Sequence, residues 1–135
     1  MTKKKTGSRI AAGILTAVFL LLFLFFAGFL PAKPVAVATG SMEPAIQVGD
    51  AAVIVTVNTD ELKAGDVIQY RKENYTVIHR IIEVTEDENG ERAFITQGDN
   101  NPTPDADPVP AGAVVGKMAF CIPKIGSLSL WLRRS

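Results

Sequence analysis

Three kinds of side chain in this sequence could together break an acyl bond. Ser41 lies in the segment TGSMEP, where glycine and proline favour a turn or an irregular loop. His79 is the only histidine among the 135 residues, and a neutral imidazole can accept a hydroxyl proton near pH 7. Asp99 and Asp105 could each accept the other imidazole N–H and fix its tautomer. This combination indicates acyl transfer through a covalent intermediate.

Each of these residues also has a plain structural interpretation. A serine in a loop is usually solvated, and His79 could be a half-buried strand residue on the same face as Val77 and Ile81. Asp99 follows a glycine and precedes an asparagine, where aspartate commonly holds a turn. One cysteine and one histidine exclude a Cys₂His₂, a Cys₄ or a three-histidine metal site. We therefore expect neither a metal nor another cofactor.

A predicted hairpin brings the histidine and the acids together. The dipeptide Asn89-Gly90 predicts a two-residue type I′ turn. In the register that this turn sets, His79 faces residue 100, and a bulge would shift the pairing by a residue or two. We expect the loop at residues 98–101 to lie close to the only histidine.

The elements that must position these residues are predicted to be β-strands. Short β-branched segments alternate with glycine and proline after residue 35. We expect strands at residues 51–57, 66–70, 75–84, 93–97 and 113–120, and a proline-rich loop at residues 98–112. About 100 residues with five or six short strands predict a mainly β fold, either a small coiled sheet or a partly closed barrel.

Residues 10–30 predict a transmembrane anchor. They contain no charged side chain, and as a helix they would be roughly 31 Å long, which matches a bilayer core of about 30 Å. Four basic residues precede them, so the positive-inside rule places residues 1–9 in the cytoplasm. Residues 31–135 would then form an extracytoplasmic domain, or a lumenal one in a eukaryote.

A cleaved secretory signal peptide is the alternative to a retained anchor. Ala36 and Ala38 supply the small residues of an A-x-A cleavage site. The apolar segment is longer than the usual apolar region of a signal peptide, about 7–15 residues, and this favours the anchor. A second apolar segment, residues 125–132, is too short to span a bilayer. It is predicted to be either an interfacial segment with Trp131 at headgroup level or a last β-strand.

The formal net charge of zero conceals a segregated charge pattern. Residues 34–110 contain all 14 acidic residues and five basic ones, a net charge of −9, while the residues from 111 onward are basic. An acidic body argues against nucleic acid as a partner. The two basic ends suit an anionic lipid bilayer.

Four short motifs occur in a fixed order behind the apolar segment. They are TGSMEP at residues 39–44, GDVI at 65–68, VIHR at 77–80, and GDNN at 98–101 followed by Asp105. In this order they resemble the type I signal peptidases. The similarity is greatest to the endoplasmic-reticulum-type branch, which is also found in archaea and in sporulating Gram-positive bacteria.

The resemblance implies a role for each residue by position. Ser41 matches the nucleophile, and His79 occupies the place where most bacterial members have a lysine base. Asp105 matches the aspartate that completes the triad of the Ser-His branch, and Asp99 matches a second loop aspartate that supports the site. Two more positions are implied to take part, an oxyanion-hole hydroxyl beside the nucleophile's N–H and a substrate-binding residue: Thr39 and Met42.

The implied function is that of a membrane-bound serine endopeptidase. It would remove N-terminal signal peptides from secretory precursors at A-x-A-type sites, and the resemblance leaves open a complex with partner subunits. A self-cleaving Ser-Lys repressor-type peptidase is an alternative, but it would need a lysine in place of His79 and normally has no anchor. A non-enzymatic, membrane-anchored extracellular β module is another, in which Ser41 and His79 would be replaceable.

Overall fold

The computed structural model describes residues 3–123 and divides the chain into two compact units. The first unit ends at Lys33 and the second begins at Pro34. The expectation for residues 125–132 lies outside the described residues. Each unit is described on its own below.

The first unit is one long apolar helix, α1 (Lys3–Phe26). Residues Thr6–Phe26 form the one helix in the described chain that is long and apolar enough to cross a membrane, with a mean hydropathy of 2.4. Gly28 ends the helix with a φ of 77°. Its N–H donates to the Phe25 carbonyl at 3.2 Å, and the Phe29 N–H donates to the Leu24 carbonyl at 3.0 Å. This Schellman cap explains why the helix ends four residues before the predicted boundary at residue 30.

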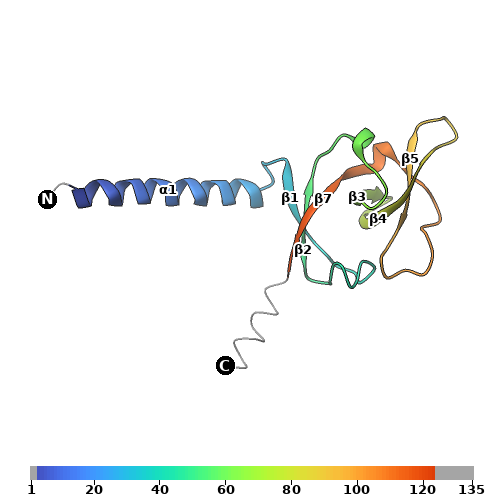
Figure 1. Cartoon of the computed structure of the whole chain (residues 1–135), viewed down its shortest axis with the longest axis horizontal. Helices are drawn as coiled ribbons and strands as arrows, with labels where there is room; N and C mark the ends of the chain where they lie inside the picture. Colours follow the sequence, from blue (N-terminus) through green and yellow to red (C-terminus); the bar gives the residue numbers. More distant parts are fainter. Residues whose placement is uncertain (1–2, 124–135) are drawn as a thin grey trace, which may run out of the picture. The chain divides into compact units, whose positions relative to one another are not determined.

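The second unit is mainly β, as predicted, and its single antiparallel sheet is not closed. The sheet has seven strands in the order β1-β2-β7-β3-β4-β5-β6. All of them except β6 are labelled in Figure 1. Their bounds are β1 (Ala32–Ala36), β2 (Ala51–Val55), β3 (Val67–Lys72), β4 (Tyr75–Glu86), β5 (Arg92–Gln97), β6 (Val109–Pro110) and β7 (Val114–Ile122). Two single-turn 3₁₀ helices, Thr59–Glu61 and Ala111–Ala113, lie in the connections.

All five predicted strands are present, and two strands were not predicted. β1 escaped prediction because it contains Pro34, which cannot donate to a ladder. Proline is tolerated there because β1 lies at the edge of the sheet. β6 has only two residues and lies inside the segment predicted to be a proline-rich loop. Both unpredicted strands are therefore edge strands with a weak sequence pattern.

The hairpin between β4 and β5 is real, but the predicted two-residue turn is wrong. Asp87 organises the turn instead, because its Oδ1 accepts hydrogen bonds from the N–H groups of Asn89 and Glu91 at 2.8 and 2.9 Å. The Gly90 N–H donates to the Asp87 carbonyl at 3.0 Å, and Gly90 has a φ of 76°. These contacts describe a three-residue loop with glycine in the left-handed conformation.

The different turn changes the register of the two strands. The pairing shifts again between Ile81 and Glu83, so that Arg80 pairs with Gln97. In the predicted register Arg80 would have paired with residue 99. The loop after β5 therefore meets His79 at Gly98 rather than at residue 100. The broader expectation, that this loop lies close to the only histidine, is confirmed.

Two apolar clusters form the core of the β unit. One contains Val37, Met42, Ile46, Ala52, Ile54 and Val67. The other contains Leu62, Ile68, Tyr70, Ile81, Phe94 and Val109. The first cluster includes residues of the segment that carries Ser41, and the second lies beneath β3, β4 and β5. The segment that carries Ser41 is thus part of the core and not a free surface loop.

Replacing Phe94 should test the second cluster. Phe94 is fully buried, whereas Phe120 on β7 is 55% exposed. Phe94→Ala should lower the free energy of unfolding by about 3–5 kcal/mol because it leaves a cavity. Phe120→Ala should change it by less than about 0.5 kcal/mol. Urea unfolding of the detergent-solubilised chain measures both, and equal losses would contradict this description of the core.

Candidate active site

Ser41 lies in a turn that is fastened to the loop after β5. The Glu43 N–H donates to the Gly40 carbonyl at 3.1 Å, which closes the predicted turn. Asn100 holds the turn from the other loop. Its N–H donates to the Ser41 carbonyl at 2.8 Å, and its side-chain amide donates to the Gly40 carbonyl at 3.2 Å. Two segments almost 60 residues apart in the sequence thus form one hydrogen-bonded platform.

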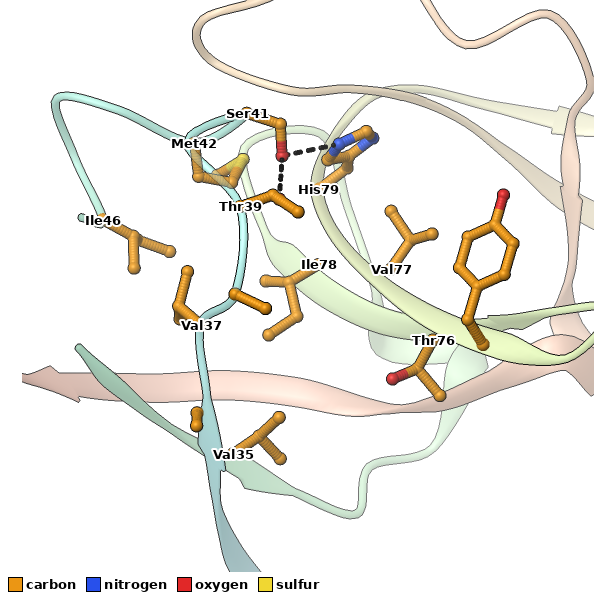
Figure 2. Close-up of a pocket in the computed structure, with 13 residues that line it drawn as sticks. Val35, Val37, Thr39, Ser41, Met42, Ile46, Thr76, Val77, Ile78 and His79 are labelled. Carbon is orange, nitrogen blue, oxygen red and sulfur yellow. Dashed lines mark hydrogen bonds between the residues drawn. The ribbon is translucent and has the colours of Figure 1, made fainter. Parts of the chain in front are cut away.

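Ser41, His79 and Asp105 form a continuous hydrogen-bonded line. His79 Nε2 lies 3.1 Å from Ser41 Oγ, and His79 Nδ1 lies 2.6 Å from Asp105 Oδ2. Figure 2 shows the serine and the imidazole facing each other. A carboxylate at Nδ1 favours the tautomer with its proton on Nδ1, which leaves the Nε2 lone pair directed at the serine hydroxyl. The geometry allows His79 to remove the proton from Ser41.

Asp105 is held as a carboxylate by several donors. Burial by itself raises its pKa, but hydrogen bonds from His79, Thr96 and Tyr70 outweigh burial, so the pKa of Asp105 lies below its ordinary value. Its Oδ2 accepts from Thr96 Oγ1 at 2.6 Å and from Tyr70 Oη at 3.0 Å. Burial, followed by the charge of Asp105, raises the pKa of Tyr70 to about 12. The phenol therefore stays protonated and acts as a donor.

Thr39, which the resemblance implies contributes to an oxyanion hole, has its hydroxyl next to that of Ser41. Its Oγ1 is 3.3 Å from Ser41 Oγ, and either hydroxyl could be the donor (Figure 2). A hydroxyl this close to Ser41 is able to donate to an oxyanion that develops beside the serine.

Asp99 contacts Arg80 rather than the histidine ring. The guanidinium makes two hydrogen bonds to the carboxylate, at 2.9 and 2.7 Å, and a third to the Gly65 carbonyl at 2.8 Å. The hydrogen bonds from Arg80 outweigh burial and lower the pKa of Asp99. The pair therefore adds stability at neutral pH, and this stability is lost as the pH falls through the lowered pKa. Asp99 anchors the loop at residues 98–101 to the strand that carries His79.

An open apolar cleft of about 540 Å³ begins at Ser41 and His79. Its walls come from two segments, residues 35–42 and the first half of β4. Figure 2 shows Val37, Ile46 and Ile78 directed into the space below the serine. Met42, proposed from the resemblance to bind substrate, lines this cleft and is only 1% exposed. The cleft can take an apolar chain segment that ends at the nucleophile.

Three residues of the site were missed by sequence reasoning: Tyr70, Thr96 and Asn100. Period-2 alternation offered a signal for two of them. Ile81 pairs with Thr96, and Tyr70 pairs with Val77, so both lie on the same face as His79. In the predicted register Thr96 would have paired with Glu83, which is on the same face but farther from His79, whereas it pairs with Ile81. For Asn100 the sequence carried no signal beyond its place in the loop motif.

The side chains around Ser41 bring together the groups that one type of reaction needs. Among residues 3–123 no group of three or more His, Cys, Asp or Glu side chains could hold a metal ion. The arrangement supplies a nucleophile, a base, an ionised partner for the base and a neighbouring hydroxyl. These are the components of acyl transfer through a serine ester.

Comparison with known proteins gives one consistent family. A model of the signal peptidase family, peptidase S26, matches residues 10–95. This range contains Ser41 and His79 and ends before the loop with Asp99 and Asp105. The chain is also similar to the signal peptidase complex catalytic subunit SEC11C of Homo sapiens, with 32% identity over 105 residues. That alignment covers 71% of this chain and 55% of the relative.

Fungal relatives give the same result. The signal peptidase complex catalytic subunit SEC11 of Lachancea thermotolerans is 34% identical over 113 residues, which cover 73% of this chain and 64% of the relative. SEC11 of Eremothecium gossypii is 39% identical over 74 residues, which cover 53% and 43%. This chain therefore spans between 43% and 64% of the length of these curated relatives.

Gly98 should be irreplaceable in this site. A Cβ at Gly98 would lie 2.6 Å from the Ser41 carbonyl oxygen, 2.7 Å from Asn101 Nδ2 and 3.0 Å from His79 Nε2. Gly98→Ala should therefore separate Ser41 from His79 and slow the reaction of Ser41 with a phosphonate ester probe at least about 100-fold, since a misplacement of about 1 Å costs that much.

Gly112→Ala is the matched control, because a Cβ there meets nothing within 4 Å. The probe should label this variant at the wild-type rate. Equal labelling of both variants would show that the two loops are less closely packed than described.

Proposed function

This chain belongs to the signal peptidase S26 family, and on that basis we propose that it is a membrane-anchored serine endopeptidase that removes N-terminal signal peptides from secretory precursors. The observation that carries the proposal is the line from Ser41 through His79 to Asp105 at the end of an apolar cleft. The relatives are named as catalytic subunits of a signal peptidase complex.

The proposed reaction proceeds through an ester on Ser41. His79 Nε2 takes the hydroxyl proton while Oγ bonds to the carbon of the scissile amide. The negative charge that develops on the carbonyl oxygen is stabilised by the Ser41 N–H and the Thr39 hydroxyl. His79 then gives the proton to the leaving amine as the C–N bond breaks. Water attacks the ester by the same route and releases the signal peptide.

The cleft explains how an extended peptide would bind. The pairing of β4 with β5 begins at Arg80, so the strand from Tyr75 to His79 is paired with β3 on one side and faces the cleft on the other. β1 is the edge strand of the sheet, and its end forms the opposite wall of the cleft. A peptide can add its backbone hydrogen bonds to such free edges. The apolar side chains below then accept small residues, which fits A-x-A-type cleavage.

The structure favours a retained anchor over a cleaved signal peptide. Cleavage after Ala38 would remove β1 and Val37, which belongs to the first core cluster. The Val37 N–H also donates to the Asp50 carbonyl at 2.9 Å. Cleavage behind Ala38 would also make Ser41 the third residue of the shortened chain. A single-pass protein with helix α1 in the bilayer keeps the catalytic unit whole.

The proposal includes topology and partners. The proposed orientation has the N-terminus in the cytoplasm and the β unit on the outer face, or in the lumen of a eukaryote. The basic residues before the apolar segment support it through the positive-inside rule. The lipid bilayer and the signal peptides of precursors are the proposed partners. Further subunits are proposed because the relatives are named as subunits of a complex.

Ser41→Ala tests the proposed function directly. Processing of a signal-peptide precursor in membranes should fall to background, because no other group replaces the attacking hydroxyl. Ser8→Ala, in the apolar helix, is the control and should leave processing unchanged. Undiminished processing in membranes that contain Ser41→Ala would exclude Ser41 as the nucleophile of this reaction.

The two loop aspartates should differ in their effect on turnover. Asp105→Asn should lower kcat by about 10³- to 10⁴-fold, because an amide at this position no longer fixes the histidine tautomer. Asp99→Asn should lower it by no more than about tenfold, since it weakens only a partly exposed ion pair with Arg80. Single-turnover cleavage of a labelled signal peptide measures both, and the reverse order would exclude Asp105 as the triad residue.

A further inference from the structure

We propose that Tyr70 and Thr96 are positioning residues that aim the carboxylate of Asp105 at His79. The inference rests on the proposed serine-peptidase function and deepens it. Neither residue touches the substrate cleft, and each acts on the reaction through Asp105.

Three neighbouring strands deliver the groups that surround the carboxylate. Tyr70 lies on β3, His79 on β4 and Thr96 on β5. The register places all three side chains on one face of the sheet, because Tyr70 pairs with Val77 and Thr96 pairs with Ile81. Asp105 comes from the loop after β5 and lies over this face. Each of the three strands therefore contributes one polar side chain to the surroundings of the Asp105 carboxylate.

All three side chains donate to the same carboxylate oxygen. Asp105 Oδ2 lies 2.6 Å from His79 Nδ1, 2.6 Å from Thr96 Oγ1 and 3.0 Å from Tyr70 Oη. The Thr96 hydroxyl has only one proton to donate. Its contact to Asp105 Oδ2 is 2.6 Å long and its contact to Tyr70 Oη is 3.4 Å long, so the proton is donated to the carboxylate. Thr96 holds the loop a second time, because its carbonyl accepts the Asp105 N–H at 2.8 Å.

The hydroxyls of Thr96 and Tyr70 are buried among apolar side chains, where a polar group needs a reason to be present. Thr96 is 0% exposed and Tyr70 is 5% exposed, on a sheet face that is otherwise lined by Ile68, Ile81 and Phe94. A buried hydroxyl is costly unless it has a partner, and valine would fill the same space as threonine without that cost. The sequence nevertheless places hydroxyls at both positions where the carboxylate arrives. This pattern is expected if they are there to orient the acid.

Two fixed donors leave the carboxylate little freedom to rotate. If Oδ2 is held by Thr96 and Tyr70, the same oxygen stays in line with His79 Nδ1 during the whole reaction. The imidazole then keeps its proton on Nδ1 and its lone pair toward Ser41. Both hydroxyls also favour the ionised acid, which stabilises the imidazolium that forms when Ser41 attacks.

The experiment uses the full chain in detergent and four variants. Thr96→Val and Tyr70→Phe remove one hydroxyl each, and Thr96→Ser retains it. Thr85→Val is the matched control, on β4 near the hairpin turn and away from the carboxylate. Two quantities are measured: kcat and KM with a labelled signal peptide, and the ¹⁵N shifts of the histidine ring. Because His79 is the only histidine, the ring signals need no assignment.

Thr96→Val should lower kcat by roughly 10- to 100-fold with little change in KM, since it removes a hydrogen bond to a charged group. Tyr70→Phe should have a smaller effect, because its hydrogen bond is longer. Both variants should reduce the Nδ1–H tautomer in the ring spectrum. Thr96→Ser should recover most of the loss, and Thr85→Val should match the wild type in both measurements.

The inference fails if folded Thr96→Val and Tyr70→Phe keep the wild-type kcat and ring tautomer. It also fails if Thr96→Ser is as impaired as Thr96→Val, because the hydroxyl would then be irrelevant. The ring spectrum requires no substrate. A wild-type chain that cleaves no signal peptide would overturn the proposed function, whereas an unaltered tautomer in the variants would overturn only the role of the hydroxyls.

Discussion

The site depends on one close approach between two loops. The backbone of the turn that carries Ser41 lies so near Gly98 that no Cβ fits between them, and the same glycine lies against His79 Nε2. Asn100 fastens the contact with hydrogen bonds to two carbonyls of the turn. Everything else follows from this approach, because Ser41 and His79 come from distant segments and meet only where these loops meet. The sheet supplies rigid supports on both sides, with β2 behind the turn and β4 beneath the histidine.

A second constraint is the burial of a carboxylate near an apolar core. An ionised Asp105 would be unfavourable next to Tyr70 of the second core cluster if it had no donors, since an ionised group loses part of its hydration there. The donors around it reverse this effect, and the pKa of the carboxyl falls. The polar groups are thus mutually dependent: the hydroxyls need the acid as a partner, and the acid needs them to stay ionised. Arg80 and Asp99 perform a separate task nearer the surface, where they hold the loop in place.

Much of the architecture could be predicted from local sequence. The β-branched segments predicted five strands correctly, and the order of the motifs indicated the family that the comparisons show. The hairpin register could not be predicted, because Asp87 and Asn89-Gly90 favour different turns and the side-chain hydrogen bonds of Asp87 decide between them. The error placed Thr96 opposite Glu83 instead of Ile81, two residues farther from His79. Tyr70 was missed for another reason, because its place opposite Val77 depends on the pairing of β3 with β4, for which no register was predicted. β1 was missed since its proline is allowed only at a sheet edge, and a sequence does not show which strand is the edge.

The half-paired strand β4 has a consequence for selectivity under the proposed function. Its free edge can pair with the backbone of a substrate through N–H and carbonyl groups. Every peptide has the same backbone groups, so this contact would not depend on most of the substrate side chains. Discrimination would then fall to the few positions that point down at Val37, Ile46 and Ile78. An enzyme built in this way tolerates very different precursors, provided that each presents an extended stretch with small residues in the right places. Such breadth suits a general processing step better than a dedicated one.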